Sequence, residues 1–334
     1  MKAIEIRDTF GLDSLKLVER PDPAPGPGQV VLKMKAFSIN YRDLLVVNGV
    51  GRWKPPGGRV PLSDGVGIVA AAGNGVSRVK VGDRVVPIFY PKWLEGRAAA
   101  KMGQALGGAA ADGVLAEYTL FDESSLVHVP AHLTDEEAAT LPCAGVTAWS
   151  AVSLFRDITP GDSVVVLGTG GVSIFALQFA RFVRARVIAT SSSDQKLARA
   201  KEFGADAVIN YKTTPDWPKA VAELTDGLGA EYVVDTVGDL KQSIAAVRLG
   251  GAVAFVGLLI GMTTEVDLAT FMGKCARIEA IDVGSREMFQ AMNEAIESHA
   301  MHPVLDRIFE FHELREALNY LREGRHFGKV CLRA

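Results

Sequence analysis

The chain has 334 residues, of which 48% are hydrophobic and 22% are charged, and its formal net charge is −3. That length is too great for one compact core and fits two domains. The slight negative charge excludes the basic surface by which proteins bind nucleic acid. The three cysteines are far apart in the chain (Cys143, Cys275 and Cys331), which excludes a disulfide framework and a cysteine-rich zinc lobe.

The N-terminal residues, MKAIEIRD, alternate as a strand does and lack the apolar core of a signal peptide. The longest apolar stretch, residues 249–261, is too short to span a bilayer. We therefore expect a cytoplasmic protein that binds neither a membrane nor a nucleic acid.

Residues 1–127 are expected to form a β-rich domain, because short alternating strands are separated by turns rich in glycine and proline. Residues 91–112 do not alternate, and we expect a long, partly helical loop beside a binding site there. Tyr90 and Trp93 lie at the start of this loop. Their rings either form an aromatic wall over a flat substrate or pack against the loop itself.

Residues 128–303 alternate strands with helices, which predicts a doubly wound parallel sheet and an α/β fold class. The expected strands cover residues 163–167, 186–190, 207–209, 232–235, 252–256 and 278–281. The expected helices cover residues 171–184, 194–203, 218–226 and 240–249. A helix at 313–323 and a strand at 329–332 follow, so we expect residues 304–334 to complete the first domain.

A glycine-rich turn follows the first strand of this second domain. The apolar run 163–167 breaks into Gly168-Thr169-Gly170-Gly171-Val172-Ser173, with Ser173 where a third glycine or alanine is usual. Such glycines let the backbone approach a pyrophosphate, whose charge the N–H groups of the next helix bind. A strand before the motif and a helix after it make this a dinucleotide-binding signature. The expected contacts are Gly168, Gly170, Gly171 and Val172.

Several short motifs of the chain together carry a family resemblance. In order they are SINYRD at 38–43, SDGVG at 63–67, LAEY at 115–118, LPCAGVTAW at 141–149, VDTVG at 234–238 and HFGKV at 326–330. With the glycine motif, they resemble zinc-independent members of the medium-chain dehydrogenase/reductase superfamily. The chain is most similar to the group of NADPH:quinone oxidoreductases and NAD(P)-dependent alcohol-dehydrogenase-like proteins. This resemblance implies a GroES-like β-rich catalytic domain and a Rossmann cofactor domain.

The resemblance also bears on metal binding. Zinc-dependent relatives hold the catalytic metal with a Cys, a His and a second Cys or Asp, and the corresponding residues here are Asn40, Ser63 and Cys143. Asp64 lies where those enzymes carry a Glu. Because catalytic zinc needs three protein ligands, we expect no bound zinc. The alternative for Cys143 is a buried core cysteine.

The second strand of a dinucleotide-binding domain ends at the residue that distinguishes NAD from NADP. Here that residue is Ser191, which is neutral, and Lys196 supplies a charge that a 2′-phosphate needs. With Ser192, and with Tyr211 near the adenosine phosphate, these residues favour NADP(H) over NAD(H). The alternative is that Ser192 belongs to a turn and Lys196 to a solvated helix face. Asp194, three positions beyond Ser191, argues for caution.

Other cofactor contacts follow from strand ends and from the resemblance. Open α/β sheets bind ligands at the carboxyl ends of their strands, which indicates Asp235, Val237, Val256, Gly257 and Leu258. The resemblance adds Thr147 beside the nicotinamide, and Gly328 and Lys329 closing over the cofactor. The alternative for Asp235 is a helix N-cap, which is compatible with a nearby cofactor.

Without a metal, hydrogen-bond donors must stabilise the charge that develops on the substrate oxygen. Asn40, Tyr41 and Arg42 follow a strand in one short segment and are the candidate donors, with Asp64 as a further catalytic candidate. Arg42 could instead form an ion pair with Asp43 or Asp64. The proton comes from Tyr41 or from solvent.

The leading hypothesis is an NADPH-dependent reductase of quinones or other α,β-unsaturated carbonyls, with a small carbonyl or quinone as substrate. A zinc-free alcohol or aldehyde oxidoreductase is the first alternative, and a non-catalytic NADPH-binding sensor is the second. We expect a homodimer, or a tetramer, because residues 263–271 and the strand at 278–281 resemble the edge through which such enzymes pair.

Overall fold

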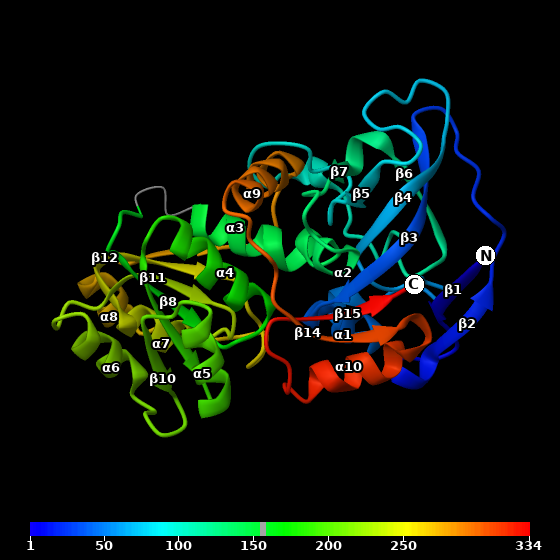
Figure 1. The fold of residues 1–334 in the computed structure, drawn as a ribbon. Coiled ribbons are helices and arrows are strands. Elements are labelled where there is room, and N and C mark those ends of the chain that lie inside the picture. The colour runs from blue at the N-terminus through cyan, green and yellow to red at the C-terminus, as the bar shows by residue number, and fades with distance from the viewer. Residues whose placement is uncertain (154–157) are drawn as a thin grey trace. The chain divides into compact units, whose positions relative to one another are not determined.

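The computed structural model describes residues 1–153 and 158–334 (Figure 1). Contacts divide the chain into two compact units, Met1–Val146 with Gly284–Ala334, and Thr147–Val283. The boundaries between the two domains were expected after residues 127 and 303. The first unit therefore extends further than expected at both points where the chain passes between the units. One reason is a long-range bond that pattern reasoning does not detect: Asn293 Nδ2 donates to the carbonyl of His128 at 2.8 Å. The chain therefore returns to the first unit before helix α9 (Arg286–Ser298), and not after it.

The first unit is built on a mostly antiparallel sheet. Its strand order is β14-β15-β3-β4-β5-β7, with β6 also pairing β3. The bounds are β3 Gln29–Ile39, β4 Asp64–Ala72, β5 Arg84–Pro87, β6 Tyr118–Asp122, β7 Leu126–His128, β14 Leu305–Glu310 and β15 Lys329–Arg333. A hairpin of β1 (Lys2–Ile6) and β2 (Leu15–Glu19) is separate from this sheet. The other α-helices of this unit are α1 (Tyr41–Val47), α2 (Asp135–Ala138) and α10 (Leu314–Arg322), and residues Leu141–Gly145 form a short π-helix.

Strand β3 is the centre of this unit, since it pairs with β4, β6 and β15. Its apolar side chains, Phe37 and Ile39 among them, are fully buried, as is expected for a central strand. Its register places Ser38 opposite Asp64 of β4, and Ile39 opposite Val330 of β15. The antiparallel pairing thus brings the end of β3, the start of β4 and the start of β15 to one place.

The segment 91–112 contains a single short turn of 3₁₀-helix, Ala100–Met102, so the expectation of a partly helical loop holds only in small part. Trp93 is buried, and its Nε1 donates to the carbonyl of Gly96 at 3.0 Å. Trp93 therefore packs against its own loop, as the second of the two interpretations has it.

The second unit is a doubly wound parallel sheet, as expected, with order β10-β9-β8-β11-β12-β13. The strands are β8 Ser163–Leu167, β9 Arg186–Ser191, β10 Ala207–Asn210, β11 Ala230–Asp235, β12 Val247–Phe255 and β13 Arg277–Ala280. The helices are α3 (Val146–Ser153, from the unit boundary), α4 (Gly171–Phe182), α5 (Asp194–Glu202), α6 (Trp217–Leu224), α7 (Leu240–Ala246) and α8 (Leu268–Gly273). The chain reverses its direction across the sheet beside β8, where such folds bind ligands.

Helix α7 ends three residues before the expected position, because β12 already begins at Val247. None of the helices in the described parts of the chain is long and apolar enough to cross a membrane.

Candidate active site

Asn40 and Asp64 form the centre of a buried polar network in the first unit. Asn40 follows β3 and precedes α1, and Asp64 begins β4, so the β3–β4 pairing holds them together. Asn40 Nδ2 donates to Asp64 Oδ2 at 2.9 Å. Asp64 is completely buried and Asn40 is 8% exposed. Two of the four predicted catalytic residues are thus in direct contact.

Lys329 joins this network from β15. Its Nζ donates to Asn40 Oδ1 at 2.5 Å and to the carbonyl of Ile39 at 2.7 Å. The sequence placed Lys329 at the cofactor, whereas these bonds tie its ammonium to the end of β3. The sequence does show a lysine among the apolar side chains of a strand, which indicates a polar network because a buried lysine needs partners. It does not reveal which partners.

Two further groups complete the coordination of the Asp64 carboxylate. The Ser63 hydroxyl donates to Oδ1 at 2.7 Å, and the Cys143 backbone N–H donates to Oδ2 at 3.2 Å. Burial raises the pKa of Asp64 to about 6, although Lys329 and the bonds from Asn40 and Ser63 act in the opposite direction. The carboxyl group therefore titrates near pH 6. Sequence reasoning did not select Ser63 as a partner of Asp64.

The stability of the protein should fall between about pH 4 and 7 relative to that of the variant Asp64→Asn. The folded state holds the Asp64 proton up to about pH 6, above the ordinary value of 3.8. Stability from this proton is therefore present at low pH and is lost as the pH rises through 6. The loss amounts to roughly 3 kcal/mol. Urea unfolding of both proteins across this pH range measures it, and parallel pH profiles would contradict the raised pKa.

Arg42 lies beside the network but is engaged elsewhere. Its Nη1 donates to Asp43 Oδ1 at 3.2 Å and to the carbonyl of Leu106 at 2.9 Å. Asp43 in turn accepts the backbone N–H of Asn40 at 2.8 Å, which fixes the start of α1. Arg42 therefore forms the ion pair with Asp43 that was the alternative to a catalytic role, and this pair anchors the segment.

Tyr41 is the first residue of α1 and is 41% exposed. Within the described residues, its hydroxyl has no hydrogen-bond partner. It is the exposed donor of the segment, next to the buried amide of Asn40.

The residues at the zinc-ligand positions of zinc-dependent relatives do not fit a catalytic zinc. Both ends of the Asn40 amide and the hydroxyl of Ser63 are already bonded, and the Lys329 ammonium lies against Asn40. Burial, aided by Asp64, raises the pKa of the Cys143 thiol well above its ordinary value, which disfavours a thiolate ligand. In the parts of the chain that the structure describes, no group of three or more His, Cys, Asp or Glu side chains could hold a metal ion.

The glycine motif of the second unit has the geometry expected of a phosphate-binding turn. Gly168 has φ +78°, which favours glycine, and α4 begins directly after Gly170, with Gly171 and Val172 in its first turn. Glycine offers no side chain to cap this helix, so its first N–H groups are suited to bind a pyrophosphate. Ser173 is accommodated because its hydroxyl donates to the carbonyl of Leu167 at 2.7 Å.

The end of β9 is arranged around Ser191, which is buried and whose Oγ accepts the N–H of Ser193 at 3.3 Å. Ser193 caps α5 by accepting the Lys196 N–H, so the residues after Ser191, Ser192 among them, form a turn into that helix. Asp194 accepts from the side chain of Asn210 at 2.6 Å. The acidic residue that argued for caution is therefore held by an amide partner.

Tyr211 begins the turn after β10. It is 41% exposed, and its backbone N–H donates to the carbonyl of Ser191 at 3.1 Å. This bond holds the predicted adenosine-side tyrosine beside the residue predicted to select the cofactor.

The loops after β11 and β12 approach each other closely. A Cβ on Gly257 would lie 1.7 Å from the carbonyl oxygen of Thr236, so only glycine fits. Asp235 accepts the N–H groups of Val237 and Gly238 at 2.9 and 2.7 Å and the hydroxyl of Ser243 at 2.9 Å. Its carboxylate thus shapes the loop, while the N-cap of α7 is Asp239.

The other predicted cofactor residues lie in ordered backbone. Val256 donates its N–H to the carbonyl of Asp235 at 2.8 Å, and Leu258 accepts the N–H of Gly261 at 3.4 Å. Thr147 is buried, and its hydroxyl donates to the carbonyl of Asp282 at 3.3 Å. Gly328 belongs to the first unit, has φ +78° and leaves no room for a Cβ beside the Val304 carbonyl.

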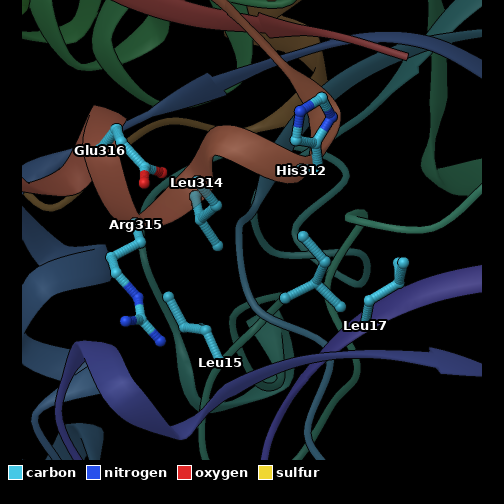
Figure 2. Close-up of a pocket in the computed structure, with 7 residues that line it drawn as sticks. Leu15, Leu17, His312, Leu314, Arg315 and Glu316 are labelled. Carbon is cyan, nitrogen blue, oxygen red and sulfur yellow. The ribbon is translucent and has the colours of Figure 1, made fainter.

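A hollow of about 260 Å³ lies on the first unit, between β2 and the start of α10 (Figure 2). Its lining residues are Ile4, Leu15, Leu17, His312, Leu314, Arg315 and Glu316. None of them belongs to the network of Asn40, Asp64 and Lys329. The hollow is thus separate from the candidate active site.

Two family models match the chain. The one described as alcohol dehydrogenase GroES-like domain matches residues 26–131, and the one described as zinc-binding dehydrogenase matches residues 171–298. A zinc-type alcohol dehydrogenase-like protein of Schizosaccharomyces pombe is 41% identical over 332 residues, covering 97% of this chain and 96% of the relative. The chain belongs to the zinc-type alcohol dehydrogenase-like family of the medium-chain dehydrogenase/reductase superfamily. Its members are oxidoreductases.

The similarity to solved structures covers the whole chain. An NAD-dependent alcohol dehydrogenase is 35% identical with a TM-score of 0.90, and each chain is covered completely. A mycobacterial protein complexed with NADPH is 27% identical with a TM-score of 0.83, again with complete coverage of both chains. The fold of the present family member is thus shared with a dehydrogenase described as NAD-dependent and with a protein complexed with NADPH.

Proposed function

We propose that this protein is an NADPH-dependent reductase of quinones or other α,β-unsaturated carbonyls that works without a metal. The observation that carries the proposal is the replacement of a metal-ligand set by the hydrogen-bonded network of Asn40, Asp64 and Lys329. The amide and the ammonium can stabilise negative charge on oxygen, but the network as a whole cannot hold zinc as three ligands would.

A nicotinamide cofactor held at the glycine motif would supply the hydride. When a hydride reaches the substrate carbon, negative charge develops on the substrate oxygen. The Asn40 Nδ2 group carries two hydrogens, and Asp64 takes one of them. The second hydrogen and the exposed hydroxyl of Tyr41 are the donors that we assign to the substrate oxygen. One proton from Tyr41 or from solvent completes the reduction.

The preference for NADPH rests on the end of β9. Ser191 is neutral, so nothing at this position repels a 2′-phosphate as a carboxylate would. Lys196 is in the first turn of α5, whose N-terminus favours negative charge. Asp194 is held by Asn210. These three features support NADPH over NADH.

The test is the oxidation of NADPH and of NADH with three substrates: 1,4-benzoquinone, an enone and a simple aldehyde. We expect a higher kcat/KM for NADPH and turnover with the quinone or the enone. Turnover with the aldehyde alone would favour a zinc-free alcohol or aldehyde oxidoreductase. Tight NADPH binding without turnover would favour the non-catalytic sensor.

We also propose that the protein pairs with a second copy through the β13 edge of its second unit. Strand β13 ends the sheet, and an unpaired edge invites pairing. Nearby segments carry exposed apolar side chains: Leu259, Ile260, Met262, Leu268 and Met272. Together, the open edge and these side chains support a homodimer.

The substitution Met272→Asp is expected to shift the protein from dimer to monomer, because it places a charge where a second copy would bury a side chain that is 74% exposed. Sedimentation velocity measures the change. Leu228→Asp, on another loop of the same unit and 61% exposed, is the matched control. A monomeric wild-type protein, or equal behaviour of both variants, would contradict this interface.

A further inference from the structure

We infer that Lys329 is a positioning residue, whose ammonium fixes the Asn40 amide so that its NH₂ end serves as the donor to the substrate oxygen. This inference rests on the proposed function and assigns Lys329 a role on the substrate side rather than at the cofactor.

The first step is the burial of the ammonium group. Lys329 is 3% exposed, and desolvating an ammonium is costly unless its hydrogens are bonded. Two of the three hydrogens are directed at Ile39 O and Asn40 Oδ1. Both acceptors lie where β3 ends, which is the segment that carries the candidate donors. The cost of burying Lys329 is thus offset at the active site.

The second step is the orientation of the amide. An ammonium only donates hydrogen bonds, so it must face the oxygen of Asn40, whereas an ionised carboxylate only accepts and must face the nitrogen. Lys329 and Asp64 lie at opposite ends of the amide, at 2.5 and 2.9 Å. Only one orientation satisfies both. Without Lys329, the amide could turn its oxygen toward the substrate and repel the developing charge.

The third step concerns the strength of the donor. A positive charge on the amide oxygen polarises the group and makes its N–H hydrogens better donors, since hydrogen bonds in a chain strengthen one another. The path from Lys329 Nζ through the Asn40 amide to Asp64 is such a chain, and all its members are buried. The positive charge that polarises the Asn40 amide is therefore that of the Lys329 side chain.

The backbone explains why Lys329 reaches this place. In the antiparallel pairing of β15 with β3, Val330 is opposite Ile39, so the preceding residue on β15 lies beside Asn40. Gly328, with φ +78°, allows the close approach to Val304 that starts the strand. The side chain thus enters the network from β15, which lies between β14 and β3 in the sheet.

The test compares Lys329→Met with the wild type and with Lys33→Met, a control lysine exposed on β3. We expect Lys329→Met to lower kcat for the quinone or enone by about 100-fold, as removal of a preorganised donor does. The dissociation constant of NADPH, measured by fluorescence, should change by less than about threefold, because the role is not in cofactor binding. A loss of NADPH affinity by about tenfold or more, with kcat retained, would overturn the inference and restore Lys329 to the cofactor.

Chemical rescue separates positioning from folding. In Lys329→Ala, added ethylammonium should fill the vacated space and raise kcat by about tenfold, and it should have no effect in Lys329→Ala combined with Asn40→Ala. Absence of rescue in the folded single variant would overturn the inference. If neither truncation folds, Lys329→Arg decides. The guanidinium group of this variant, like an ammonium, only donates hydrogen bonds, so the variant should keep at least about a tenth of the wild-type kcat. A lower kcat would overturn the positioning role.

A readout without turnover keeps this inference distinct from the proposed function. The side-chain NH₂ signal of Asn40 in a ¹H–¹⁵N spectrum, identified by its loss in Asn40→Ala, should shift and exchange faster with water in Lys329→Met. An unchanged signal would overturn the inference. If the wild type reduces none of the carbonyl substrates, the proposed function fails, while this signal still decides whether Lys329 orients Asn40.

Discussion

Replacing Asn40 by alanine is expected to lower kcat for the quinone or enone by about 10²–10³-fold, the effect of losing one preorganised donor in a site of this kind. The Asn40 amide has a hydrogen left for a substrate oxygen, because Asp64 occupies only one of the two on Nδ2. Its loss also removes an acceptor from Lys329. KM should change much less than kcat, since the bond strengthens as charge develops.

Steady-state kinetics, with the NADPH dissociation constant measured on the same samples, tests this prediction. Asn48→Ala is the matched control, because Asn48 is exposed at the other end of α1 and its side chain donates to the carbonyl of Leu44. A folded Asn40→Ala variant that binds NADPH and retains the wild-type kcat would remove Asn40 from the reaction and leave Tyr41 as the candidate donor.

Replacing Ser191 by aspartate is expected to lower kcat/KM for NADPH by about 100-fold while that for NADH is kept or raised. A carboxylate at the end of the second strand repels a 2′-phosphate and accepts a bond from a ribose 2′-hydroxyl. The turn should persist, since a carboxylate can accept the Ser193 N–H that Ser191 Oγ accepts now. The change in preference should therefore arise at the cofactor and not from unfolding.

The ratio of the two kcat/KM values, measured with one carbonyl substrate, is the decisive quantity. Leu228→Asp adds the same charge to another loop of the second unit, outside the proposed pairing edge, and should leave the ratio unchanged. If the ratio responds equally to both substitutions, the effect is one of net charge. If Ser191→Asp has no effect on it, the selection of cofactor does not occur at Ser191.

Much of the second unit could be predicted because its signals are local. The buried run 163–167 has the same bounds in the structure as in the expectation, since a β-branched apolar run between a turn and a glycine leaves little choice. The bounds of β9, β10 and β11 differ by no more than two residues from the expected ones. The helix before β12 was expected to be too long, because Val247 begins a strand that its partner β11 selects.

The candidate active site could be predicted only in part. Asn40 and Asp64 were identified because their segments resemble known motifs, but their contact depends on the register between β3 and β4. Lys329 was assigned to the cofactor from the family resemblance, and nothing local shows that β15 pairs with β3 in the register that places it beside Asn40. Pairings across 290 residues of sequence are set by the whole sheet and not by local pattern.

The most direct test of metal-free reduction is the single-turnover rate of NADPH oxidation by an enone, measured on protein treated with a strong chelator and analysed for bound metal. We predict that the rate is unchanged by the treatment and that the treated protein contains far less than one metal ion per chain. A rate that is lost with the metal and restored by added zinc would contradict the account and return Cys143 to the role of a ligand.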